Sequence, residues 1–518
     1  MNKIGVIGEN LKDKIKQWVP TFITCMIFSV IIYFMLLTKG LVNSDDGLWE
    51  YNYYKAGSWS LSLGRWFWLY LDRLRFGIST EPITSLLALI CYSIGIVIMY
   101  DLFDINKSGK LTFLVSALFM SSISVSASLS FRFMSTDFGA AFLLAMSAAW
   151  AIIKIKRIWL AVIAGGILIA LSAGVYQTYI GCTCITLVGY FLIALWNDKI
   201  ELKSIIWDIL KSVLAAILGG ILYFLILQLH LTIFHISLSD YNGANTYSLM
   251  NAIKNLPFNI GYTYRVFIRY YFENYFKLNV LREFKIYWIV FLLAAVFLIR
   301  ELLCIAKRSI TRALLFVLFM AAIPIASNAV LLITTGVWVS LHMTVAMALC
   351  IPVLLCVEAQ NCKGKVWSWI WKINVLILLI VLYGNIYQLQ IDQEAMWEGQ
   401  KATTMIAGEI IHKLDETGNL DADAQYCVLG SPMGNELFYF SVIAEKANGY
   451  ALFGNWNSGM RRSWQGVFRN LCGINLEMCT SADYGAIAAN PEVESMTVFP
   501  EEGSIIRIDD IVVIKVSP

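Results

Sequence analysis

The stretch Trp18–Thr38, WVPTFITCMIFSVIIYFMLLT, leads after four residues into Asn43-Ser44-Asp45-Asp46-Gly47. About 20 apolar residues are enough to cross a bilayer as a helix, so the acidic pair stands at the mouth of a predicted membrane span. Carboxylates close to lipid are costly, and such residues mark functional sites by default. The rest of the chain is therefore interpreted as a membrane scaffold that brings a substrate to Asp45 and Asp46.

The composition sets the class of protein. Hydrophobic residues make up 58% of the chain and charged residues only 14%. Soluble domains carry about 25% charged residues, so the sequence predicts a polytopic membrane protein. No basic stripe lies on a soluble module, which argues against nucleic acid as a partner. Eleven cysteines are scattered along the chain, and a disulfide among Cys427, Cys472 and Cys479 is left open.

About eleven membrane helices are predicted from runs of roughly 20 apolar residues. They lie near residues 20–38, 83–102, 112–130, 137–153, 158–175, 178–196, 209–230, 286–303, 313–334, 341–358 and 368–388.

The short loops predict the orientation. Basic residues gather after every second span, at Lys107 and Lys110; Lys154, Lys156 and Arg157; Lys199 and Lys203; Lys307, Arg308 and Arg312; Lys363 and Lys365. The short loops on the other side carry almost nothing basic apart from Arg132. The positive-inside rule therefore places the N-terminus in the cytoplasm. An odd number of spans then places the C-terminus outside, and the acidic pair, which follows the first span, is also outside.

Three domains follow from these patterns: a cytoplasmic segment 1–19, a membrane domain 20–389 and a soluble extracytoplasmic domain 390–518. Long outer loops are expected at about 39–82 and 231–285, the first with short interfacial helices. In the tail, the runs Tyr426–Leu429 and Ile511–Ile514 read as strands, which predicts a small α/β domain.

The chemistry of the acidic pair has two readings. A carboxylate at a lipid-facing cleft can remove a proton from a hydroxyl, and with substrate oxygens it can hold a divalent cation. Alternatively, the pair caps an interfacial helix that begins near Gly47, because Asn, Ser and Asp are good caps. One acid is enough for a cap, which leaves the second unexplained and favours function.

The order of these features resembles the GtrII-type glucosyltransferases. An acidic pair follows the first span, and an aromatic run leads to Gly64-Arg65-Trp66. Further on, Ser172-Ala173-Gly174-Val175-Tyr176-Gln177 is similar to the Tyr-Gln element of that family. The resemblance covers roughly residues 20–390. It implies a GT-C-like membrane fold, a sugar carried on a polyprenyl phosphate such as undecaprenyl-phosphate glucose, and a bacterial plasma-membrane location. In such enzymes an acidic residue of the first outer loop lies at the active site, which carries over to Asp45 or Asp46. The sequence Asp-Asp in place of Asp-x-Asp leaves the use of Mg²⁺ or Mn²⁺ open.

The reaction implied by the resemblance is an inverting transfer, plausibly of glucose, to a cell-surface glycan on the outer face. Its leaving group is a phosphate monoester, which needs positive charge where negative charge develops. Arginine suits phosphate because its planar fork donates two hydrogen bonds at once. The candidate donor-phosphate ligands are Arg65, Arg132, Arg265 and Arg269, with snorkelling to the head groups as the alternative for the last two.

The candidate substrate-binding residues are polar side chains at the same face. Tyr176 and Gln177 can bond sugar hydroxyls, although a polar pair between two spans is often only a loop. Asp137 could line the cavity, cap its helix or pair with Arg132. His342 opens the tenth span, where a lone histidine more often has a structural role. His230 and His235 have poor spacing for helical metal ligands, so no zinc site is predicted.

Two rival functions are kept. A transporter or flippase for a lipid-linked sugar would carry charged or Gly/Pro-broken segments at mid-membrane. A polysaccharide polymerase or ligase would share the loops and the donor but differ in acceptor.

Overall fold

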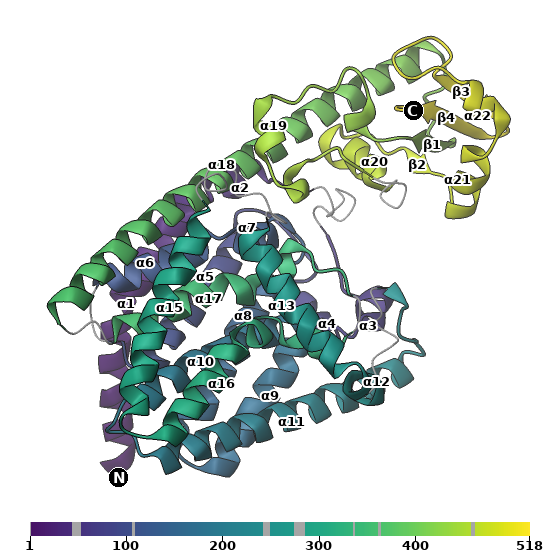
Figure 1. The fold of residues 1–518 in the computed structure, drawn as a ribbon. Coiled ribbons are helices and arrows are strands. Elements are labelled where there is room, and N and C mark those ends of the chain that lie inside the picture. Colours follow the sequence, from purple (N-terminus) through teal and green to yellow (C-terminus); the bar gives the residue numbers. More distant parts are fainter. Residues whose placement is uncertain are drawn as a thin grey trace.

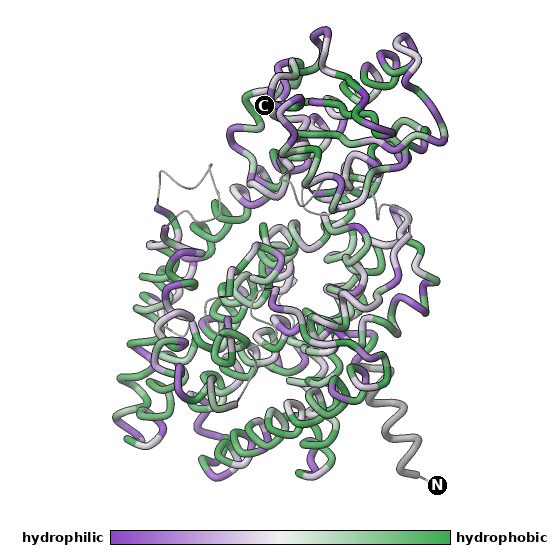
Figure 2. The backbone as a smooth tube through the Cα atoms, turned by 90° about the vertical axis from the view of Figure 1, so that its right-hand side faces the viewer, coloured by the Kyte–Doolittle hydropathy of each residue, from purple (hydrophilic) through white to green (hydrophobic). Residues whose placement is uncertain are grey.

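The structure is a computed structural model, and it describes residues 2–43, 53–105, 109–241, 249–273, 285–334, 337–360, 364–456 and 462–518. A large helical body and a smaller mixed domain are joined by one long helix, α18 (Lys365–Glu416), as Figure 1 shows. Figure 2 shows that apolar residues dominate the helical body, whereas the smaller domain is a mixture of polar and apolar residues.

The prediction of a polytopic all-α membrane protein is confirmed. Within the described ranges, nine helices are long and apolar enough to cross a membrane, and a pair of helices bent by 52° would make a tenth. The remaining predicted span, 341–358, corresponds to a shorter apolar helix of 15 residues. The helices of the body are α1 (Asn2–Ile32), α2 (Phe34–Lys39), α5 (Ile83–Leu102), the bent pair α6 (Gly109–Met120) and α7 (Ile123–Ser130), α8 (Ser135–Lys154), α9 (Ile158–Val175), α10 (Ile180–Trp196), α11 (Leu202–Ile233), α15 (Ile286–Ala306), α16 (Ile310–Ser327) and α17 (Val345–Ala359).

Burial separates central from peripheral helices. α10 and α17 are mostly enclosed by other helices. By contrast, α11, α15 and α16 expose large side chains such as Leu225, Leu292 and Leu314, each more than 60% exposed. Without water in the bilayer core this exposure carries no hydrophobic penalty, so these helices form the lipid-facing surface.

Short helices fill the two longest connections. α3 (Ser58–Ser62) and α4 (Trp68–Leu74) lie between α2 and α5, as predicted for the first long loop. α12 (Leu249–Lys254) and α13 (Leu256–Phe272) lie between α11 and α15. Single helical turns also connect helices of the body. They are η2 (Gln177–Tyr179) between α9 and α10, and η4 (Ala329–Leu332) and η5 (Leu341–Met343) between α16 and α17.

The C-terminal α/β domain is confirmed as well. Its strands are β1 (Gln425–Leu429), β2 (Glu477–Met478), β3 (Ile505–Ile508) and β4 (Ile511–Lys515), in the order β2-β1-β4-β3. β1 runs parallel to β2 and β4, and β3 runs antiparallel to β4. The helices around the sheet are α19 (Val442–Lys446), α20 (Arg462–Gly466), the π-helical turn η9 (Val467–Leu471), α21 (Ser481–Ala488) and α22 (Pro491–Ser495).

Alternation along β1 gives the sheet two apolar faces. Tyr426 and Val428 pack with Trp464 and the end of α18 at Ile410. Cys427 and Leu429 face the other way, into a second cluster with α21 and α22. The domain therefore has three layers, with α18 as part of one of them.

A buried carboxylate ties this domain to the helical body. Asp392 of α18 accepts hydrogen bonds from the side chains of Asn448 (2.9 Å) and Tyr450 (2.8 Å). Tyr450 in turn lies 3.0 Å from Ser126 of α7. Because Asp392 is fully buried, its hydrogen bonds fix how the domain is seated on the body.

Candidate active site

Two segments that are far apart in the sequence meet at the break between α9 and α10. The backbone N–H of Phe67 donates to the carbonyl of Gly174 (2.8 Å), and the Gln177 side chain donates to the carbonyl of Leu63 (2.7 Å). Gly64 has a φ of 80°, and a Cβ there would lie 2.8 Å from Gln177 Nε2 and 2.4 Å from the Tyr223 hydroxyl. Only glycine allows this close approach. The sequence elements around Gly64 and Gln177 are therefore one structural unit.

Arg65 lies at the centre of this unit. Its guanidinium carbon is 4.4 Å from the centroid of the Tyr176 ring and 5.7 Å from that of Trp68. Aromatic faces attract cations at this distance. The Nε of Arg65 is buried and has no hydrogen-bond partner among the described residues. Arginine carries five N–H donors and no acceptor, so this side chain is positioned to bind an anion.

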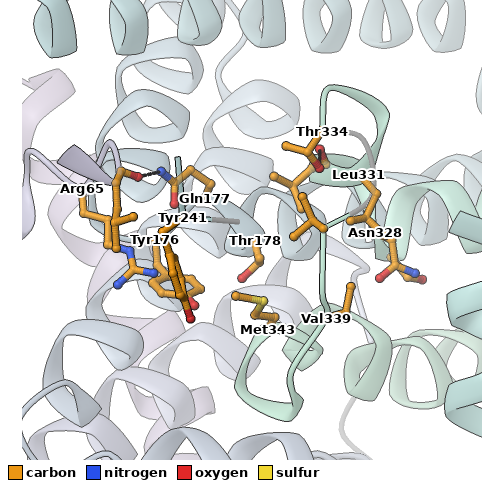
Figure 3. A pocket seen from close by; sticks show the side chains of 14 residues that line it. Arg65, Tyr176, Gln177, Thr178, Tyr241, Asn328, Leu331, Thr334, Val339 and Met343 are labelled. Carbon is orange, nitrogen blue, oxygen red and sulfur yellow. Dashed lines mark hydrogen bonds between the residues drawn. The ribbon is translucent and has the colours of Figure 1, made fainter. Parts of the chain in front are cut away.

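A pocket of about 60 Å³ opens beside Arg65 (Figure 3). Its wall is partly apolar, and we call it the polar pocket for the guanidinium, amide and hydroxyl groups that also line it. Arg65, Tyr176 and Gln177 form one wall, and residues around η4, including Asn328 and Thr334, form the opposite wall. Thr178 points into the space between them, and its hydroxyl is buried without a described partner. The volume holds roughly four to six water-sized groups, which is the scale of a phosphate with neighbouring hydroxyls.

The side chain of His342 is hydrogen-bonded to the Tyr176 hydroxyl. Its Nε2 lies 2.8 Å from the Tyr176 hydroxyl, and the rings of Phe131 and Phe138 lie against it. Burial, and to a smaller extent the nearby charge of Arg65, lower the pKa of His342 to about 3. The imidazole is therefore neutral at pH 7, with one ring nitrogen as donor and the other as acceptor.

A second cavity, of about 460 Å³, adjoins the polar pocket. It lies between α9, α10, α11 and α16, and its lining is almost entirely apolar. Gln177 and Val330 line both spaces, so they form the shared wall. A polar site and a large apolar cavity thus share a boundary between membrane helices.

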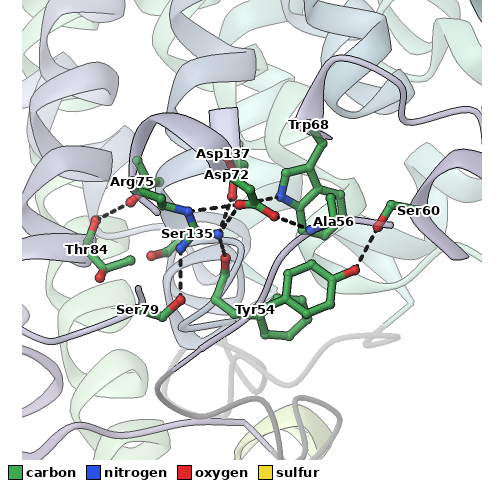
Figure 4. A network of polar contacts seen from close by, with 12 residues as sticks. Tyr54, Ala56, Ser60, Trp68, Asp72, Arg75, Ser79, Thr84, Ser135 and Asp137 are labelled. Atoms are coloured by element: carbon green, nitrogen blue, oxygen red, sulfur yellow. Dashed lines mark hydrogen bonds and ion pairs between the residues drawn. The ribbon is translucent and has the colours of Figure 1, made fainter. Parts of the chain in front are cut away.

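A buried ionic network contains Trp68, the second aromatic ring beside Arg65, and Figure 4 shows this network. Asp72 accepts the indole N–H of Trp68 (3.1 Å) and the backbone N–H of Ala56 (2.6 Å). Arg75 pairs with Asp72 and, at 3.1 Å, with Asp137. Burial raises the pKa of Asp72, and the Arg75 charge opposes that rise. The network holds Trp68, on which the Arg65 guanidinium rests.

The predicted site residues fall into separate groups. Arg65, Tyr176 and Gln177 line one pocket, and His342 contacts Tyr176. Asp137 belongs to the Arg75 network, in the first turn of α8. Asp45 and Asp46 lie outside the described residues. The residue described just before them, Asn43, donates to the Ser130 hydroxyl (3.0 Å).

The other predicted arginines do not line the pocket. Arg132 is buried and donates through Nε to the carbonyl of Ser79 (2.8 Å). Arg265 is exposed on α13, and Arg269 of the same helix lies 3.7 Å from Glu273, the residue that follows the helix. Their role toward a donor phosphate stays a prediction.

Comparison with known proteins assigns the family. The model of the family described as Glucosyl transferase GtrII matches residues 34–350, which is more than half of the chain. The chain belongs to the GtrII glucosyltransferase family. No curated protein and no solved structure matches it. The matched range contains Arg65, Tyr176, Gln177 and the whole polar pocket, so this multi-pass membrane glycosyltransferase carries the pocket within its family-defining part.

Several residues in and around the polar pocket were not predicted from the sequence. Asp72 and Arg75 are spaced like an ordinary surface pair on a helix, and only their burial distinguishes them. The one sequence feature that could have pointed to Thr178 is that it directly follows Tyr176 and Gln177. Asn328 and Tyr223 sit in apolar runs that read as plain membrane helix. For a metal, the described part of the chain holds no group of three or more His, Cys, Asp or Glu placed as ligands.

The Arg75 network gives a prediction for stability. Arg75→Ala leaves the carboxylates of Asp72 and Asp137 buried without their counter-charge, and breaking such a pair costs about 3–5 kcal/mol. We expect a clearly lower midpoint of thermal unfolding for the detergent-solubilised variant. Arg73→Ala is the matched control, since Arg73 is exposed on the same helix α4 and its loss should cost less than about 0.5 kcal/mol. Equal midpoints for the two variants would contradict a structural role for the network.

Proposed function

We propose that this glucosyltransferase transfers glucose from a polyprenyl-phosphate donor to a hydroxyl of a cell-surface glycan. The reaction would occur at the extracytoplasmic face of a bacterial plasma membrane, in a GT-C type enzyme. The observation that carries the proposal is Arg65, a cation held by aromatic rings with its Nε unbonded at the edge of a polar pocket. Family membership favours sugar transfer over the transporter reading.

The donor would divide between the two adjoining spaces. Its phosphate suits Arg65, because a guanidinium fork gives two parallel hydrogen bonds to phosphate oxygens. Its lipid suits the apolar cavity of about 460 Å³ on the far side of Gln177. The sugar would then lie in the polar pocket near Thr178, where a buried hydroxyl lacks a partner among the described side chains. This arrangement supports a lipid-linked donor over a soluble sugar nucleotide.

The transfer step follows from these positions. The acceptor oxygen attacks the anomeric carbon, and the bond from that carbon to the phosphate oxygen breaks with inversion. The hydroxyl proton passes to a carboxylate, for which Asp45 or Asp46 is proposed. The leaving polyprenyl phosphate takes the electron pair, and the Arg65 charge stabilises the negative charge that develops on it.

The neutral state of His342 fits this scheme. A protonated imidazole beside Tyr176 would repel the Arg65 cation, and burial removes that charge. Tyr176 can therefore present its ring face to Arg65 while its hydroxyl is held by His342. We propose that Tyr176 and His342 orient the cation and Gln177 holds the loop that carries it.

The direct test is sugar transfer by the purified protein in vesicles that contain polyprenyl-phosphate glucose. As acceptor we would use surface polysaccharide extracted from the cells that make the protein. Arg65→Gln should lower the rate about 100-fold or more, the size of the loss when one charge-stabilising group is removed. Arg65→Lys should fall in between, because it keeps the charge but loses the planar fork. Arg73→Gln, at an exposed position of α4, is the control. Near-native transfer by Arg65→Gln would contradict the phosphate-binding role.

The same assay tests the base. Asp45→Asn and Asp46→Asn, each checked for unchanged thermal unfolding, are expected to differ. One should lose about 10²- to 10⁴-fold in rate while still binding donor. If both keep near-native transfer, the pair is a helix cap and the base lies elsewhere. If the native protein moves the donor across the bilayer without transferring sugar, the transporter reading replaces ours.

A substitution in the apolar cavity tests the lipid assignment. Gly220 of α11 lines this cavity, and a Cβ there would meet no atom within 4 Å. Gly220→Leu should therefore fold normally but occupy space meant for the lipid. Displacing about two methylene groups costs roughly 1.6 kcal/mol, so the half-saturating concentration of a long-chain donor should rise about tenfold.

A donor with a chain of only two isoprene units should be nearly unaffected by Gly220→Leu. Gly408→Leu on α18 is the control, because a Cβ at Gly408 is equally unobstructed and this glycine lines neither space. Equal effects on long and short donors would place the lipid elsewhere.

A further inference from the structure

Two exposed aromatic rings lie together beside the polar pocket, and one of them, Tyr241, lines it. Trp59 of α3 and Tyr241, which follows α11, have ring centroids 5.5 Å apart and planes inclined at 62°. Trp59 is 55% exposed and Tyr241 56% exposed. Neither ring is used by the mechanism above.

The backbone beneath this aromatic pair is fixed. The N–H of Ser239 donates to the carbonyl of Ser62 (3.0 Å), which joins the chain after α11 to the end of α3. The hydroxyl of Ser62 donates to the carbonyl of Trp59 (2.8 Å). The two rings are therefore presented by connected segments, and little ordering is needed for them to receive a ligand together.

The position of the pair separates it from the donor lipid. Tyr241 lines the polar pocket, as do Arg65 and Gln177, but neither Tyr241 nor Trp59 lines the apolar cavity. The α11 residues that line that cavity end at Phe224, well before the helix ends at Ile233. Tyr241 lies beyond that helix end, so the pair and the cavity adjoin the pocket at different walls.

An exposed Trp or Tyr in a membrane protein commonly anchors the interface with lipid head groups. Here Tyr241 instead forms part of the wall of a polar pocket that also contains an unbonded hydroxyl and an arginine. A hexose ring has an apolar C–H face and hydroxyls at its rim. Trp and Tyr combine a flat apolar ring with a polar tip, which complements that surface.

We propose that Trp59 and Tyr241 form a stacking platform for a hexose unit of the acceptor glycan, which enters the pocket at a different wall from the one shared with the lipid cavity. The platform rests on the proposed function, since it presumes that the polar pocket is where sugar is transferred. It places the acceptor hydroxyl at the open end of the pocket, with the donor phosphate behind it at Arg65.

The test separates acceptor from donor. Transfer by Trp59→Ala and Tyr241→Ala would be measured over a concentration series of the extracted surface polysaccharide, and then of polyprenyl-phosphate glucose. The half-saturating polysaccharide concentration should rise roughly three- to tenfold, the scale of one aromatic contact, while that of the donor stays within about twofold. Tyr241→Phe keeps the ring and should restore most of the affinity. Trp159→Ala is the control, because Trp159 is 58% exposed at the start of α9 and lines neither space.

Two results would overturn the platform: an unchanged half-saturating polysaccharide concentration, or a rise in that of the donor alone. Binding of the same polysaccharide to nanodisc-embedded protein, measured by surface plasmon resonance, needs no turnover. Weaker binding by Trp59→Ala but not by Trp159→Ala supports the platform even if the native protein transfers no sugar. Binding of this kind without any sugar transfer would contradict the proposed function and still support glycan binding by Trp59 and Tyr241.

Discussion

The contact between the Arg65 guanidinium and the Tyr176 ring joins the chain between α2 and α5 to the break between α9 and α10. Each partner depends on a close backbone approach, at Gly64 for the first segment and at Gly174 for the second. A Cβ at Gly174 would lie 2.6 Å from the Trp66 ring. The contact therefore fixes the polar pocket in the helical body. A cation that is held by the faces of neutral aromatic rings keeps its N–H donors for an anion, which is what a phosphate-binding residue needs.

A buried ionic network lies next to the contact between Arg65 and the aromatic rings. Asp72 and Asp137 are held near lipid-embedded helices, where an unpaired charge is expensive, and Arg75 pairs with both. These pairs make this side of the site rigid. Through Trp68 this rigidity reaches Arg65. The site thus combines a fixed cation with an adjoining apolar cavity. The C-terminal domain is anchored to the same helical body through Asp392.

The sequence predicted what depends on local pattern. Long apolar runs located the membrane helices, and short β-like runs located β1 and β4 within one residue at each end. The length rule is less informative for α17. This helix has 15 residues, too few for a full span, and neighbouring helices enclose it. Arg132 stood out as an isolated cation in a short loop, and the structure buries it against the carbonyl of Ser79. What could not be predicted depends on tertiary proximity. The burial of Arg75, the partnership of Trp59 with Tyr241 and the apolar cavity all arise from segments that are distant in the chain.

The most direct test of the account is a cryo-electron microscopy map of the protein in lipid nanodiscs with polyprenyl-phosphate glucose bound. The account predicts phosphate density within hydrogen-bond distance of the Arg65 guanidinium. It also predicts chain density that continues past Gln177 into the cavity between α9, α10, α11 and α16. Phosphate density beside Arg265 and Arg269, with the cavity empty of lipid, would contradict it.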